Sequence, residues 1–212
     1  MISRFDRADV GVMRVQDSMR SDHEDSVHNG GFCMWGTMKT PIGLPAAPDF
    51  DHPLEMLAAC HDRIEDRLET LELLLHHIGA HGCDEQARQA AMNVIRYFDT
   101  AGDHHHQDEE VDLFPLLEAR AKSAAALTLR LRSDHANMRA LWHTLRVPLR
   151  AIAEGTSAEL DPTLIDEFAR NYRNHIALEE SELLPLAGLV LEEPVVAALG
   201  AHMAQRRGVQ IK

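Results

Sequence analysis

The sequence predicts an all-α protein: an antiparallel up-down four-helix bundle with a short C-terminal helix and a poorly structured N-terminal extension. Apolar residues recur at steps of three and four residues along four long segments, which is the period of an amphipathic helix. Leu and Ala dominate the apolar set, and aromatic residues make up only 5% of the chain. This composition favours helices packed on helices over a β-sandwich. Short links between long helices favour antiparallel neighbours.

The first two predicted helices form one hairpin. The first begins at Pro53, with Asp51 as its N-cap, and ends at residues 79–82. Its inward stripe comprises Leu54, Leu57, His61, Ile64, Leu68, Leu71, Leu75 and Ile78. The second begins near Asp84, and Pro115 is expected to kink or break it. Its stripe comprises Ala91, Ile95, Phe98, Gly102, His105, Glu109, Asp112 or Leu113, and Leu116.

The third and fourth predicted helices form a second hairpin. The third covers about residues 122–153, and its stripe comprises Leu131, His135, Met138, Trp142, Leu145, Leu149 and Ile152. The fourth begins after Asp161 and Pro162, a pair typical of a helix start. Its stripe comprises Leu164, Phe168, Tyr172, His175, Glu179 and Leu183. A short fifth helix, about residues 193–206, is expected to cover one end of the bundle.

Residues 1–49 differ in composition from the rest of the chain. They contain Gly, Ser, Asp and Asn without a sustained apolar period, so we expect an N-terminal extension that is mostly disordered. Met38 is a candidate start of the natural chain. The predicted folded domain covers residues 50–208.

Charge and cysteine content restrict the partners and the compartment. The formal net charge of −13 disfavours binding to nucleic acid or to an anionic membrane. No apolar run approaches the roughly 20 residues that a membrane-spanning helix needs. Three cysteines without a Cys-x-x-Cys pair fit free thiols in a reducing compartment, so we expect a cytoplasmic protein.

One motif occurs twice. The segments from His105 to Leu116 and from His175 to Leu186 share the pattern His-x3-Glu-Glu-x-acid-Leu-x-Pro-Leu. A lone histidine lies in the apolar stripe one helix earlier in each case, His61 before the first copy and His135 before the second. The chain therefore resembles two helical hairpins related by a pseudo-two-fold axis.

This spacing indicates a metal site. Residues four apart lie on one helix face, so each histidine of the motif points in the same direction as the first glutamate after it. Buried carboxylates are costly unless they are paired or bind a cation. The predicted ligands are His61, His105, Glu109, His135, His175 and Glu179. Mixed imidazole and carboxylate ligands in a helical bundle favour two iron ions, with manganese or zinc as alternatives. The same register places His104 and His106 beside the seam, partly exposed, and it directs Glu110 and Glu180 away from the axis.

Both copies of the motif resemble the signature of the hemerythrin-like HHE cation-binding domain. Residues 59–64 resemble the first-helix ligand region of that family, and residues 199–208 resemble its bacterial members, so the resemblance covers about residues 50–208. It implies a hemerythrin-like bundle around a non-haem di-iron centre. Oxygen-carrying members have a fifth histidine on the third helix, but Leu131 and Arg139 lie four residues before and after His135.

The resulting set of four histidines and two glutamates resembles that of the family's iron–sulfur-cluster repair proteins, which respond to nitric oxide and oxidative stress. Those proteins usually carry an N-terminal cysteine-containing domain, whereas Cys33 stands alone here. The leading hypothesis is a binding protein, not an enzyme, that binds or senses O2 or NO or handles iron under stress. The alternatives are a redox or repair enzyme that uses the same centre, and a structural bundle with vestigial ligands. A ferritin-like Glu-x-x-His motif and a zinc-protease His-Glu-x-x-His motif are both absent.

Overall fold

A computed structural model describes residues 49–210, and the predictions for the N-terminal extension and Cys33 lie outside this range. Within it the chain is helical and no strand occurs. None of these helices combines the length and the apolar character needed to cross a membrane. The elements are α1 (Pro53–His81), α2 (Glu85–Phe98), α3 (Ala101–Gln107), the π-helical η1 (Asp108–Leu113), α4 (Phe114–Arg120), α5 (Ala124–Ala153), α6 (Pro162–Leu178), the π-helical η2 (Glu179–Leu183), α7 (Leu184–Val190) and α8 (Glu193–Arg206).

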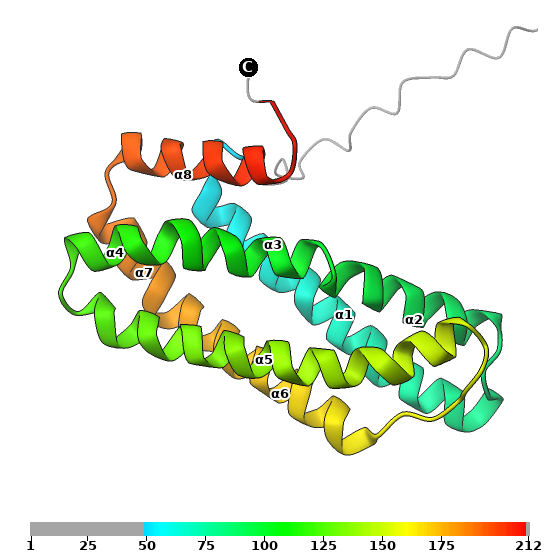
Figure 1. Cartoon of the computed structure of the whole chain (residues 1–212). Helices are drawn as coiled ribbons and strands as arrows, with labels where there is room; N and C mark the ends of the chain where they lie inside the picture. Colours follow the sequence, from blue (N-terminus) through cyan, green and yellow to red (C-terminus); the bar gives the residue numbers. More distant parts are fainter. Residues whose placement is uncertain (1–48, 211–212) are drawn as a thin grey trace, which may run out of the picture. The chain divides into compact units, whose positions relative to one another are not determined.

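The described elements form four antiparallel rods, which confirms the predicted bundle (Figure 1). The first and third rods are the single helices α1 and α5. The second rod is the succession α2, α3, η1 and α4, and the fourth is α6, η2 and α7. Both α2 and α6 pack against α1 and α5, so each rod lies beside the rods that precede or follow it in the chain. Helix α8 lies across one end, against α1 and η1.

The helix starts predicted near Asp84 and after Asp161 both have a side-chain cap. Asp84 accepts a hydrogen bond from Ala87 N, and Asp161 accepts one from Thr163 N. Such caps satisfy backbone N–H groups that have no partner in the first turn. The predicted cap at Asp51 is wrong, because His52 occupies the cap position of α1 and makes no side-chain cap bond.

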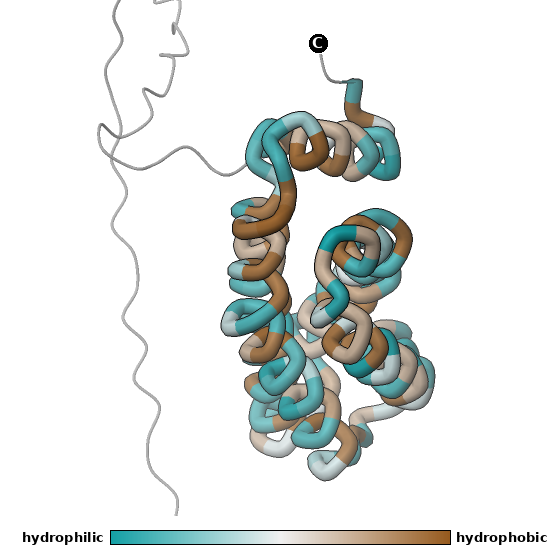
Figure 2. The backbone as a smooth tube through the Cα atoms, turned by 90° about the vertical axis from the view of Figure 1, so that its left-hand side faces the viewer, coloured by the Kyte–Doolittle hydropathy of each residue, from teal (hydrophilic) through white to brown (hydrophobic). Residues whose placement is uncertain are grey.

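The core consists of two apolar clusters. Each helix is amphipathic, with apolar and polar residues alternating around its coil (Figure 2). One cluster, near the α2 end, contains Ile64, Phe98, Met138 and Phe168 among its buried members. The other, near the α8 end, includes Leu57, Leu113, Leu131 and Leu183. In α1 and in α5, the histidine of the apolar stripe separates residues of one cluster from residues of the other.

The second rod does not run as one continuous helix. It breaks at Asp99 and Thr100, and it then passes through a π-helical turn before Pro115. Phe114 N bonds to Glu109 O, five residues back. A π-turn takes up one extra residue, which moves the buried face by one position, so Leu117 is buried in place of the predicted Leu116.

The π-turn also explains how the helix tolerates Pro115. In a π-helix the carbonyl of Glu110 would accept a hydrogen bond from the N–H group five residues later, at position 115. Proline has no N–H group, so this carbonyl has no backbone donor. Arg132 Nη1 donates to this carbonyl at 3.0 Å. The predicted break at Pro115 is therefore wrong, because the rod continues into α4 with Pro115 in its first turn.

Helix α8 is fixed by charge and by close backbone packing. Arg206 and Arg207 both form ion pairs with Asp108, whose side chain is fully buried. Gly200 packs so closely on the chain before α1 that an added Cβ would lie 1.9 Å from Phe50 O. The helix thereby holds η1 against the rest of the bundle.

Candidate metal centre

The structure brings the six predicted ligands together in one buried layer between the two apolar clusters. None of their side chains is more than 2% exposed. Each rod supplies part of the layer, which comprises His61 from α1, His105 and Glu109 from the second rod, His135 from α5, and His175 and Glu179 from the fourth rod.

Each glutamate faces both pairs of histidines. Glu109 Oε1 lies 3.4 Å from His105 Nε2, and its Oε2 lies 3.3 Å from His135 Nε2. Glu179 Oε2 lies 3.1 Å from His61 Nε2, and its Oε1 lies 3.0 Å from His175 Nε2. The layer therefore contains two ligand groups that share both carboxylates. The first group has His61 and His105, and the second has His135 and His175.

These short distances are not ordinary hydrogen bonds. All four carboxylate oxygens of the two glutamates are buried, and none has a hydrogen-bond partner. The same holds for His61 Nε2 and for both ring nitrogens of His105. Buried polar atoms without partners are rare and costly. Lone pairs that converge without pairing with each other suit a cation between them, so these residues fit two metal ions.

The separation of His135 and His175 supports the same interpretation. Their Nε2 atoms lie 2.9 Å apart. Two nitrogens bound to one ion at about 2.1 Å, on adjacent positions, would lie about 3 Å apart. Two lone pairs at this distance repel each other unless a proton or a cation lies between them.

The pKa values of the two glutamates are shifted in opposite directions. Burial and the charge of Glu179 raise the pKa of Glu109 well above its ordinary value. Burial alone would raise the pKa of Glu179 as well, but His175 and His61 outweigh it and lower that pKa. Burial also lowers the pKa of His105 to about 3. Without a cation the layer thus carries less charge than its residues suggest, because a buried pair of carboxylates cannot easily ionise together.

A second pair of glutamates orients two of the histidines. Glu110 Oε1 lies 2.7 Å from His135 Nδ1, and Glu180 Oε1 lies 3.1 Å from His61 Nδ1. A carboxylate only accepts hydrogen bonds, so each Nδ1 donates and each Nε2 keeps its lone pair toward the layer. The hydrogen bond from His135, assisted by Arg139, lowers the pKa of Glu110 to about 2. The second glutamate of each motif copy therefore fixes the lone histidine of the other hairpin.

The prediction that His106 is partly exposed is wrong. Its side chain is only 4% exposed, and its ring stacks on that of His135 with centroids 4.0 Å apart. The second rod packs against both α1 and α5, so consecutive residues of α3 can both be buried. His105 faces His61 of α1, whereas His106 faces His135 of α5.

The two cysteines in the described part of the chain, Cys60 and Cys83, lie outside the ligand groups. Cys60 precedes His61 and is buried, and burial raises the pKa of its thiol. The thiolate, which is the reactive and ligating form, is therefore disfavoured at this position.

The fold and the layer define a class: a four-helix bundle with a histidine and carboxylate cation site in its core. Residues 52–187 match the hemerythrin HHE cation-binding domain family, and the chain belongs to this family. An uncharacterized protein of Haemophilus influenzae is 30% identical over 161 residues, which cover 76% of this chain and 93% of that protein. The family match and the buried ligand groups together indicate a metal-binding protein.

Proposed function

We propose that this protein is a non-haem di-iron protein of the cytoplasm that binds or senses O2 or NO, or holds iron under stress. The observation that carries the proposal is the sharing of both carboxylates. Each of Glu109 and Glu179 directs one oxygen toward each pair of histidines. A ligand set of bridging carboxylates and imidazoles suits iron. Other metals favour sites made of thiolates or of oxygen ligands alone.

The residues around the layer support a binding role. Two apolar clusters flank it, and all six ligand side chains are buried. Glu110 and Glu180 hold two ligand rings in one orientation. Two iron ions bound there would supply redox-active positions that a diatomic molecule can occupy. A preorganised site lowers the cost of binding such a small ligand.

The test is the metal content of protein purified without oxygen from iron-fed cells, with its visible spectrum before and after O2. We expect about two irons per chain and a new charge-transfer band that disappears on degassing. Two irons with turnover in the presence of an electron donor would favour a redox or repair enzyme instead. A folded helical protein without metal would contradict the proposal and favour vestigial ligands. Repeating the titration with NO distinguishes the two candidate gases.

A further inference from the structure

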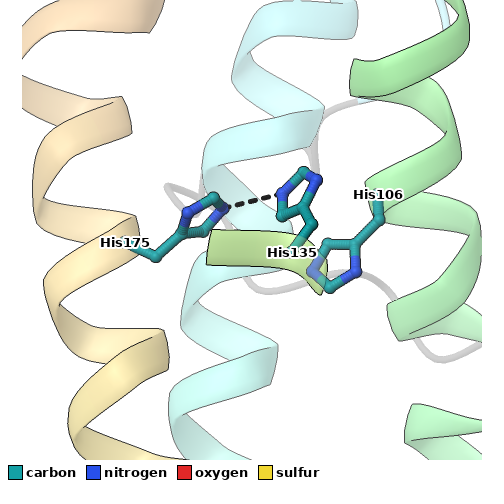
Figure 3. Close-up of side chains that lie close together, drawn as sticks. All are labelled: His106, His135 and His175. Carbon is teal, nitrogen blue, oxygen red and sulfur yellow. Dashed lines mark hydrogen bonds between the residues drawn. The ribbon is translucent and has the colours of Figure 1, made fainter. Parts of the chain in front are cut away.

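His106 is a buried histidine with no role in the two ligand groups described above. Its ring projects from α3 toward His135, on the side away from His175 (Figure 3). His106, His135 and His175 nevertheless each offer a nitrogen within 4.8 Å of the others. The cluster therefore extends the second ligand group by one imidazole.

The surroundings of His106 leave a ligand atom available. Its Nε2 is buried and has no hydrogen-bond partner. Its ring lies between those of His135 and Tyr172, nearly parallel to both. An imidazole nitrogen without a hydrogen-bond partner can offer its lone pair to a metal ion.

The first ligand group has no such addition. Among the described residues, its members are His61, His105 and the two shared glutamates. We propose that His106 is a fifth histidine ligand, bound to the ion held by His135 and His175. This inference rests on the two-ion centre proposed above. It makes the two ions unequal, because the second is held by one more imidazole than the first.

The spacing of the three histidines is compatible with binding to one ion. A nitrogen of each lies within 4.8 Å of a nitrogen of the other two, and nitrogens bound to one ion at about 2.1 Å lie at most about 4.2 Å apart. The ring must turn, because it faces His135 at an interplanar angle of 22°. A cavity of about 260 Å³, lined by Gly102, His106 and Tyr172 among others, provides space for this turn.

Two substitutions separate ligation from packing. His106→Phe keeps an aromatic ring against His135 and removes the nitrogens, whereas His106→Ala removes both. His104→Ala is the matched control, because the neighbouring His104 is partly exposed and belongs to no ligand group. The probe is Co²⁺, titrated into the metal-free full-length chain in competition with a chelator, with the visible absorption of Co²⁺ as a second readout of its coordination.

We expect two binding steps in the native protein and in the His104 variant. In both His106 variants the tighter step should weaken by at least about tenfold, and the other step should stay within about twofold of its native value. Native affinity for both ions in His106→Phe would overturn the inference and leave His106 as a packing residue. If the native protein itself shows no binding step, the two-ion centre is refuted instead. Circular dichroism establishes that each variant is folded.

Discussion

Replacing Glu109 with glutamine should stabilise the metal-free protein and abolish its response to metal. The pKa of Glu109 is raised, so the folded state binds a proton that the unfolded state releases as pH rises above the ordinary value of 4.5. The metal-free native protein therefore loses stability as pH rises above 4.5. Glutamine mimics the protonated carboxyl in size and shape, and it removes this loss.

The upper limit of the effect follows from the pH interval. About 2.5 pH units at about 1.4 kcal/mol each limit the effect to about 3 kcal/mol at pH 7. For a domain of this size, 1 kcal/mol corresponds to about 2–4 °C in Tm, so the melting temperature should rise by at most about 12 °C. With metal at 1,000 times its Kd the order reverses, since binding then stabilises the native protein by about 4.1 kcal/mol.

The assay is urea unfolding of both proteins at pH 5 to 8, with a chelator and then with Co²⁺ or Fe²⁺. The difference between the two proteins isolates Glu109, because every other residue is common to both. Glu182→Gln is the control, since Glu182 is exposed in η2, the corresponding π-helical turn of the fourth rod. A metal-free Glu109→Gln protein that is less stable than the native one at pH 7 would refute the reasoning, as would retention of the metal response.

Four further substitutions test the surroundings of the layer and the packing of α8. Glu110→Ala should weaken metal binding about 10- to 100-fold in chelator competition, and unchanged affinity would show that the orienting hydrogen bond has no effect on the metal. Arg206→Ala leaves the buried Asp108 with one cation fewer and should lower the free energy of unfolding in urea by up to about 3 kcal/mol; a change below about 0.5 kcal/mol would contradict the role of this ion pair. Gly200→Ala should lower Tm because its Cβ meets backbone, whereas Gly188→Ala, in open space on a helix, should gain about 0.5–1 kcal/mol; equal responses would contradict the packing of α8.

The sequence predicts the fold well wherever one helix keeps one register. The predicted stripe of α5, from Leu131 to Ile152, is buried throughout. The predicted α8, about residues 193–206, matches its observed bounds. In the second rod the register changes at Asp99 and again at the π-turn. Apolar spacing alone cannot indicate either change, because it assumes a constant rotation per residue.

The six predicted ligands lie together, but two features of the layer were not foreseeable from spacing. The burial of His106 depends on the contact of α3 with two neighbouring rods, and sequence periodicity describes only one face. The partners of Glu110 and Glu180 lie on other helices. The available signal was the Glu-Glu pair that occurs in both copies of the motif. Tertiary packing decides which histidine the second glutamate of each pair contacts.

Glu110 and Glu180 each contact a histidine of the opposite hairpin, and this has a consequence for a chain cut between the hairpins. Each hairpin supplies the two histidines of one of the two shared-carboxylate ligand groups, yet that group takes one shared carboxylate and one orienting carboxylate from the other hairpin. Residues 121–123 are the short link between the two hairpins. A protein divided at this link would consist of two fragments, neither with a complete ligand group for an ion. Their association would then depend on metal, which would make the pair a split protein that assembles when iron is supplied and separates when it is withdrawn.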